Sequence, residues 1–280
     1  MPSRTVRGRR LGIALRELRE AAGLTLEQVA EEVDLTKSTI SRIETAQTPV
    51  RPAIVRVLLT LYGASTKDMD LLVQLAKEAK VQSWWQGYAD LLNKPMLEWI
   101  AFESEATAIS TFEPVIMPGL LQTAEYARGI MRAHPTLRSD AEIERRVEAR
   151  MARQERLIGE SPLELLAIFD ETALVRPIGD DPAQVLAGQR EHLLKMSRLP
   201  NITIQVLPVA VGYHPAVTSG IHVMEFADPA DPPVVGLGTV AGVMVLDNPE
   251  EVRNCVAVMG NLRSLALSPA DSRANIAAIS

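Results

Sequence analysis

The segment from Thr36 to Glu44 carries several hydrogen-bond donors at a spacing that could bind a charged polymer. Ile40 and Ile43 are three residues apart, which is the spacing of the buried face of a short helix. The outer face is then left with four donors, Lys37, Ser38, Ser41 and Arg42. Ammonium, guanidinium and hydroxyl groups on one helix face can bind phosphates and reach base edges.

The elements around this segment can be predicted from their end signals. Thr25 and Gln28 form a Thr-x-x-Gln capping box, which starts a helix. Asp34-Leu35 makes a tight turn, and Thr36 is a good N-cap for the donor-bearing helix. Two short helices joined by such a turn are typical of a helix-turn-helix, which places its second helix in the major groove of DNA.

Three further helices would complete a five-helix bundle over residues 9–80. Leu11, Leu15 and Leu18 recur at helical spacing, so the first helix should run to about residue 22. The other two are expected over about residues 52–62 and 67–80. Pro52 suits the first turn of the former. We therefore expect an all-α domain that holds the outer face of residues 37–42 toward solvent.

Charge is distributed unevenly along the chain. Residues 1–80 contain 13 basic and 10 acidic side chains, whereas residues 81–280 contain 16 basic and 25 acidic ones. An arm over residues 1–8 and the start of the bundle carry four arginines, Arg4, Arg7, Arg9 and Arg10. Such an arm could lie along phosphates or in a minor groove, or it could be a disordered tail. A basic front on an acidic body fits a local contact with DNA.

Residues 9–80 resemble the XRE family of lambda-repressor-like helix-turn-helix proteins. The segments that carry the resemblance are 24–30 and 36–44. Two positions depart from the family pattern: Asp34 and Ala46 stand where the family often has glycine. The resemblance implies that Lys37, Ser38 and Arg42 read bases. We assign the DNA contacts to Thr25, Gln28, Lys37, Ser38, Thr39, Ser41, Arg42, Arg9 and Arg10. The alternative is a helical bundle that serves only protein interaction.

The remaining residues, 83–280, predict an α+β domain with a mainly antiparallel sheet. Clean alternation in 201–208 is typical of a strand. Helices are expected near 120–127, 140–158, 182–197 and 252–265, and strands near 109–112, 163–169, 201–208, 221–226, 234–237 and 240–246. The chain as a whole is therefore multidomain. All three tryptophans lie between 84 and 99, where they should form a hinge or part of a core.

Three arginines of the predicted 140–158 helix share one stripe. Arg146, Arg150 and Arg153 stand at positions i, i+4 and i+7. This stripe is either a solvated face with ion pairs or a surface for a partner or an anionic ligand. His214 follows a predicted strand and is a weaker candidate for the same ligand, because a lone loop histidine is more often structural.

The second domain also resembles a known one. Residues 118–127 (Pro-Gly-Leu-Leu-Gln-Thr-x-x-Tyr-Ala), Arg150-x-x-Arg153-Gln154 and 204–208 look like an uncharacterised regulatory domain of actinobacterial transcription factors. The resemblance implies a possible partner, a small protein encoded by a neighbouring gene, in an arrangement likened to antitoxin and toxin. One departure is the strand at 234–238, which is rich in glycine where an aromatic residue is common.

Several functions find no support in the sequence. The four histidines lack metal-ligand spacing, and no nucleophile elbow or dinucleotide fingerprint occurs. We expect no metal, no cofactor and no enzyme activity. Cys255, the single cysteine, lies among valines and should be inert, which suits a reducing cytoplasm. No apolar run is long enough for a signal peptide or a membrane span, so we expect a cytoplasmic protein.

These observations favour a homodimeric, sequence-specific transcription regulator that binds a double-stranded operator. Residues 83–280 would sense a small protein or a metabolite. The first alternative is an antitoxin-like protein that holds a partner and uses DNA binding for autoregulation. The second is a ligand-modifying enzyme fused to a DNA reader, which would need Glu103, Arg150, Arg153, Glu171 and His214 to converge in a pocket.

Overall fold

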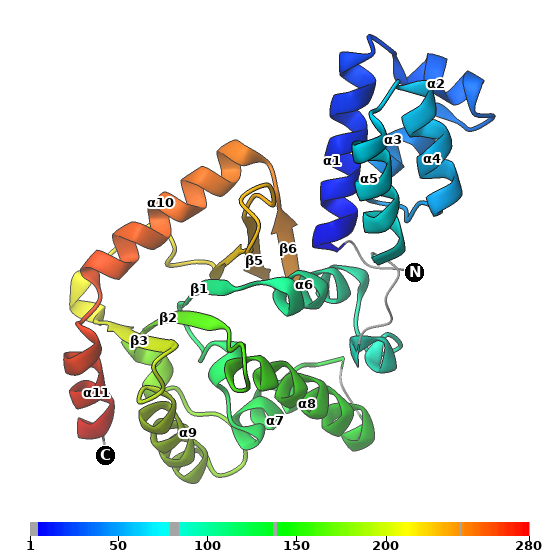
Figure 1. Ribbon diagram of the computed structural model, residues 1–280. Helices are drawn as coiled ribbons and strands as arrows, with labels where there is room; N and C mark the ends of the chain where they lie inside the picture. Colours follow the sequence, from blue (N-terminus) through cyan, green and yellow to red (C-terminus); the bar gives the residue numbers. More distant parts are fainter. Residues whose placement is uncertain (1–4, 79–83, 137–138, 241, 280) are drawn as a thin grey trace. The chain divides into compact units, whose positions relative to one another are not determined.

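The computed structural model describes residues 5–78, 84–136, 139–240 and 242–279. The chain divides into two compact units, Met1–Gly87 and Tyr88–Ser280. The first is built of helices and the second of a six-stranded sheet with helices on both faces (Figure 1). Each unit is described by itself.

The first unit is the five-helix bundle expected from the sequence. Its helices are α1 (Val6–Ala21), α2 (Leu26–Glu32), α3 (Lys37–Glu44), α4 (Pro52–Leu61) and α5 (Thr66–Glu78). Both predicted caps are confirmed: Thr25 and Gln28 form the capping box of α2, and the Thr36 side chain accepts from the Thr39 amide. The core is a single cluster that includes Leu15, Val29, Ile40 and Leu59.

The basic arm is shorter than predicted. Residues 1–4 lie outside the described part of the chain, and Thr5 caps α1 by accepting a hydrogen bond from the Gly8 amide at 3.0 Å. From Val6 onward the backbone is helical, so Arg9 and Arg10 stand on α1 and not on an extended arm. The cap at Thr5 was not predicted from the sequence, because the apolar repeat of this helix begins only at Leu11.

A buried ion pair joins α1 to α3. The Arg19 guanidinium donates to both carboxylate oxygens of Glu44, at 2.6 and 3.0 Å, and also to the Leu24 carbonyl at 2.9 Å. Both side chains are less than a tenth exposed. Close by, a Cβ on Gly12 would come within 2.4 Å of the Glu44 carbonyl oxygen, so α1 and α3 approach more closely than a side chain would permit. These contacts fix the C-terminal end of α3.

Two non-glycine residues of this unit adopt left-handed backbone conformations. Asp34, in the turn between α2 and α3, has φ +53°, and Ala46, just beyond α3, has φ +54°. Aspartate tolerates this conformation better than most residues with a side chain, so the departure from glycine at Asp34 is mild. Ala46 adopts the same conformation, although a side chain there meets a steric penalty that glycine avoids.

The second unit is a mixed sheet in the order β3-β2-β1-β4-β5-β6. Its strands are β1 (Ala108–Glu113), β2 (Glu164–Asp170), β3 (Ile202–Leu207), β4 (Ile221–Glu225), β5 (Val234–Thr239) and β6 (Gly242–Leu246). The predicted mainly antiparallel sheet is wrong, because β1, β2 and β3 run parallel and only β4, β5 and β6 add antiparallel pairs. Helices connect the parallel strands, as crossover connections require.

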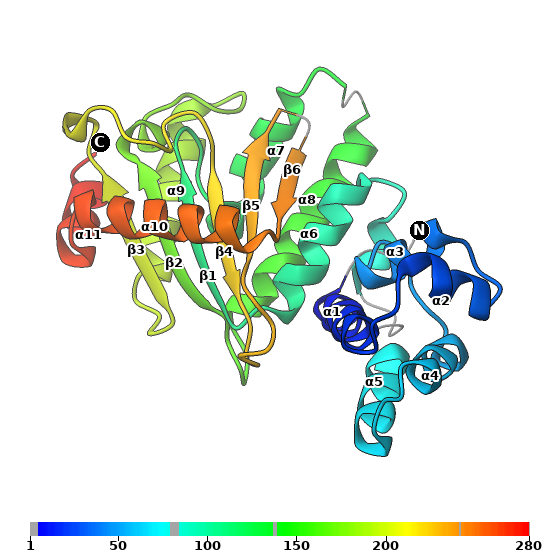
Figure 2. The ribbon, with the colours of Figure 1, turned by 90° about the horizontal axis from the view of Figure 1, so that it is seen from above.

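Helices cover both faces of this sheet. They are α6 (Lys94–Glu105), α7 (Ala124–Arg132), α8 (Asp140–Gln154), α9 (Pro182–Met196), α10 (Pro249–Leu265) and α11 (Pro269–Ala278). Figure 2 shows α10 crossing one face, with α6, α7, α8 and α9 on the other. The α10 face forms a core with Phe112, Val223 and Val235. Alternate residues of the same strands therefore face α6 and α8.

Helix α6 was not predicted from the sequence. Its residues were interpreted only as part of a cluster of tryptophans. Its start signals are ordinary: Asn93 accepts a hydrogen bond from the Met96 amide at 3.0 Å, and Pro95 stands in the first turn. Trp99 of α6 is buried, and a Cβ on Gly236 of β5 would come within 2.2 Å of its ring. The glycine-rich strand thus makes room for a tryptophan that comes from another element.

Ala46→Gly should stabilise the first unit by about 1 kcal/mol, because glycine adopts a positive φ without the clash of a Cβ. The control is Ala22→Gly at a right-handed helix end, where added chain entropy should destabilise by about 0.5–1 kcal/mol. Native-state hydrogen exchange of first-unit peptides measures both. Equal destabilisation by the two substitutions would contradict the strain at Ala46.

Glu44→Gln should cost the first unit about 3 kcal/mol, since it leaves the Arg19 charge buried without a counter-ion. Glu20→Gln is the surface control: Glu20 is exposed, pairs with Arg16 at 2.9 Å and lies 3.4 Å from Arg19, so its loss should destabilise the unit much less than the loss of Glu44. The same hydrogen-exchange measurement compares them. Similar losses for both variants would mean that the buried pair does not hold α3.

Candidate nucleic-acid interface and ligand cavity

The outer face of α3 is accessible and lightly held. Lys37, Ser38 and Arg42 are exposed, while Thr39 and Ser41 are half-buried. Lys37 pairs with Glu27 of α2, and both side chains are 60% exposed, so the pair opens at little cost. Arg42 Nε donates to the Ser38 carbonyl oxygen at 3.2 Å, and Arg42 Nη2 lies 3.5 Å from Thr39 Oγ1. These contacts orient the donors along the helix without covering them.

The other predicted DNA-contact residues fall into two groups. Thr25 and Gln28 are exposed at the start of α2, where each side chain already bonds the other's backbone amide. Arg9 is buried and Arg10 is half-buried on α1. Contacts of all four with phosphates stay predictions, and the argument for DNA binding rests on α3.

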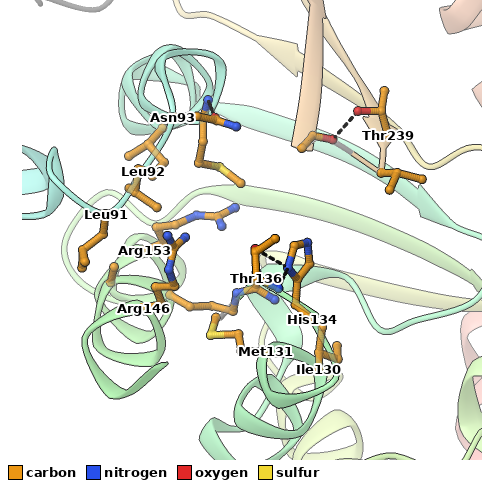
Figure 3. Close-up of a pocket in the computed structure, with 16 residues that line it drawn as sticks. Leu91, Leu92, Asn93, Ile130, Met131, His134, Thr136, Arg146, Arg153 and Thr239 are labelled. Atoms are coloured by element: carbon orange, nitrogen blue, oxygen red, sulfur yellow. Dashed lines mark hydrogen bonds between the residues drawn. The ribbon is translucent and has the colours of Figure 1, made fainter. Parts of the chain in front are cut away.

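The second unit contains a cavity between its sheet and α6, α7 and α8. One part has a volume of about 510 Å³ and the other about 600 Å³. The two parts share lining residues on α6, on α8 and on the β5–β6 hairpin, namely Met96, Arg150, Arg153, Thr239, Val240 and Gly242. Figure 3 shows Arg146 and Arg153 on α8, with Met131 and His134 from the α7 side and Thr239 opposite.

The predicted arginine stripe lines this cavity, as Arg146, Arg150 and Arg153 all contribute to it. Arg153 makes a bidentate pair with Glu103 of α6, at 2.6 and 2.7 Å, and Glu103 is almost fully buried. Arg146 pairs with Glu142 at 2.9 Å. Arg150 instead donates to a neutral amide oxygen, Gln122 Oε1, at 2.5 Å. The stripe is therefore not a simple solvated face.

The segment from Met117 to Gln122 positions that amide. Gln122 is fully buried, and its Nε2 donates to the Met117 carbonyl at 2.7 Å. Gln154 of α8 donates to the Gln122 carbonyl at 2.7 Å, and Gln189 of α9 donates to the Leu121 carbonyl at 2.6 Å. The Pro-Gly-Leu-Leu-Gln-Thr motif thus links α8 and α9 around one wall of the cavity. A half-satisfied network of this kind would be costly, so its parts should move together.

The sheet contributes a second polar group to the cavity. Thr111 Oγ1 lies 2.6 Å from His222 Nδ1, and His222 Nε2 lies 3.4 Å from Glu113 Oε1. Burial raises the pKa of Glu113 to about 8, although the charge of Arg150 acts in the opposite direction. Burial also lowers the pKa of His222 to about 4, and the charge of Arg153 acts in the same direction. At neutral pH this cluster is largely uncharged.

Neither His214 nor Glu171 lines this cavity. His214 is buried with its ring edge-on to Phe112, which belongs to the α10 face of the sheet. Glu171 directly follows β2 and accepts from the Val209 amide, just beyond β3, at 3.1 Å. Of the five residues considered for a pocket, Glu103, Arg150 and Arg153 come together. The sequence did not identify Glu113, Gln122 or His222; strand alternation places Glu113 on the same face as Thr111, but it does not mark a cavity.

Two negative findings concern the described part of the chain. No helix there is both long and apolar enough to cross a bilayer. Within the same residues, no three His, Cys, Asp or Glu side chains gather in a way that could hold a metal ion.

Glu113→Gln should remove a pH dependence of stability. Between the usual value of about 4.5 and the folded pKa of about 8, the native carboxyl keeps a proton that the unfolded chain releases. The contribution of Glu113 to stability therefore falls as pH rises through this window, by about 2–4 kcal/mol between pH 5 and pH 8. Urea unfolding of the second unit should show that the free energy of unfolding of Glu113→Gln increases relative to that of the parent chain as pH rises from about 5 to about 8.

In the native state the groups around Glu113 do not titrate in that window. In the unfolded chain His222 titrates near its usual pKa of 6.5, which makes stability rise with pH, but this contribution is common to both proteins and cancels in their difference. The pKa of His222 is about 4, that of Arg150 about 10 and that of Tyr126 about 12, each shifted chiefly by burial. A difference between the two proteins that is the same at pH 5 and pH 8 would show that the Glu113 carboxyl ionises in the native state near its ordinary pKa.

Comparison with known families agrees with both halves of this description. Residues 10–72 match a family model described as a helix-turn-helix domain, and residues 97–278 match one described as a domain of unknown function, DUF5753. No curated protein and no solved structure matches the chain. The first match supports a DNA-binding regulator with an XRE-like domain. The second covers well over half of the residues, and the chain therefore belongs to the DUF5753 family.

Proposed function

We propose that this protein is a sequence-specific transcription regulator that reads DNA with α3 and receives a signal in its second unit. The observation that carries the proposal is the exposed row of Lys37, Ser38 and Arg42 on a short helix. The buried Arg19–Glu44 pair fixes this helix on the bundle. Arginine and lysine reach guanine edges and phosphates, and a rigid scaffold sets their register on the duplex.

The proposal includes a homodimer on a two-fold operator. A helix of eight residues contacts only a few base pairs, so a single copy gives limited specificity. Two copies of α3 in successive major grooves, about 34 Å apart, would read two half-sites and multiply the discrimination. Sedimentation of the full chain with a selected duplex should give two chains per DNA.

Of the two kinds of signal considered, a small molecule is favoured over a small protein. The cavity beside α8 is of the size that encloses a small organic ligand. A signal changes DNA affinity only if it binds two states of the chain unequally. The network from Met117 to Gln122 provides a linked element that a ligand at Arg150 would contact.

Arg42→Ala should weaken binding to the preferred duplex by about 1–3 kcal/mol, which is about fivefold to 150-fold. The duplex is first selected from a random pool with the parent protein, and affinities are then measured by fluorescence anisotropy. The loss should be larger on the selected duplex than on a random one, because a base contact carries sequence information.

Arg16→Ala is the matched control, since Arg16 is an exposed arginine of α1 that pairs with Glu20. It should bind the selected duplex within about twofold of the parent chain. Retention of full affinity and selectivity by Arg42→Ala would rule out α3 as the reading element.

A further inference from the structure

The cavity of the second unit holds a charge without a matching partner. Arg153 is neutralised by Glu103, and Arg146 by Glu142. Among the described residues, no carboxylate lies within ion-pair distance of Arg150, whose hydrogen bond to Gln122 supplies no negative charge. A guanidinium in a partly enclosed, weakly solvated site is costly unless an anion joins it.

The Glu113 carboxyl, which acts on Arg150 electrostatically, does not offset that cost. Glu113 lines the same cavity, and burial raises its pKa to about 8, so the group is mostly protonated at neutral pH. A protonated carboxyl is a hydrogen-bond donor and acceptor. Its neighbours His222 and Thr111 are also polar and uncharged. The cavity is therefore lined by one cationic group without a carboxylate partner and by a neutral, hydrogen-bonding cluster.

Much of the remaining wall is apolar. Met96 and Trp99 contribute from α6, Ile109 from β1 and Val243 from β6. Gly238 of β5 also lines the cavity, and a Cβ there would lie 3.6 Å from the Gly220 amide nitrogen, in ordinary van der Waals contact, so a side chain at this position could be accommodated and would take up cavity space. A small molecule with an apolar body fits these walls. A dianion does not, because Glu103 keeps its negative charge beside Arg153.

We propose that this cavity binds a small organic monocarboxylate, with its carboxylate on Arg150 and its apolar body against Trp99, Ile109 and Val243. The planar guanidinium matches a carboxylate in a bidentate geometry. The neutral cluster of Thr111, His222 and Glu113 binds a hydroxyl or carbonyl at the far end of the molecule. This inference rests on the proposed function, in which the second unit senses a metabolite, and it gives that metabolite a chemical class.

The ligand carboxylate also competes with Gln122 for Arg150. Gln122 is also hydrogen-bonded to Met117 and to Gln154. Loss of the hydrogen bond from Arg150 to the Gln122 side-chain oxygen should therefore change the packing of the segment from Met117 to Gln122. Binding and the arrangement of this segment are therefore coupled through one hydrogen bond.

The test uses the full chain and two defined probe pairs: octanoate with octanamide, and indole-3-acetate with indole-3-acetamide. Calorimetry and thermal shift measure binding at neutral pH. At least one carboxylate should bind at least about tenfold more tightly than its amide, because a charge-assisted pair replaces a neutral contact. Failure of both carboxylates to bind, or equal binding of acid and amide, would overturn the proposal.

Three variants locate the site. Arg150→Gln should lose about tenfold or more in carboxylate affinity, and Gly238→Val should lose binding by filling the cavity while leaving every charge in place. Arg253→Gln, an exposed arginine on α10 across the sheet, is the control and should bind as the parent chain does. Circular dichroism checks that each variant is folded. Unchanged binding by both Arg150→Gln and Gly238→Val would place the carboxylate elsewhere and refute the assignment.

DNA affinity, measured on the same samples, separates this inference from the proposed function. If a carboxylate binds at Arg150 but does not change affinity for the selected duplex, the site stands and the sensing role fails. If no carboxylate binds while the selected duplex is still recognised, the site fails and the DNA-binding role stands.

Discussion

The proposed DNA-reading surface, the outer face of α3, depends on one buried ion pair, between Arg19 of α1 and Glu44 at the end of α3. A helix of eight residues has little stability of its own, so α3 needs tertiary contacts to persist. The Arg19–Glu44 pair adds a directional contact, because a bidentate guanidinium–carboxylate interaction restricts the orientation of α3 relative to α1. Gly12 lets α1 lie against the same end of the helix. The exposed donors of α3 thereby gain a fixed position.

The second unit uses the same chemistry and leaves it incomplete. Glu103 and Arg153 form a buried bidentate pair that fastens α6 to α8, one turn from Arg150. Arg150 has a position as well defined, but its partner is an amide. A neutral Glu113 and a neutral His222 leave the local charge uncompensated. The contrast between two arginines on one helix is the physical basis for assigning one to structure and the other to a ligand.

The sequence predicted the elements better than their partners. Capping residues and apolar spacing are local signals, so Thr25, Thr36 and the helices of the first unit could be found without a structure. Arg19 and Glu44 are 25 residues apart and on different helices, and no local pattern joins them. The strands were predicted, but their pairing was not. Helices predicted between the first three strands are typical of parallel pairing, whereas the later strands and their turns suggested an antiparallel sheet. Thr111 and His222 are 111 residues apart, so their cluster was missed and His214 was chosen instead.

The most direct test of the central claim is hydrogen–deuterium exchange of the full chain with and without its selected duplex. The account predicts slower exchange on DNA in peptides that cover residues 25–28 and 36–45, with the strongest protection around Arg42. Protection confined to other surfaces, with exchange in residues 36–45 unchanged by DNA, would contradict it.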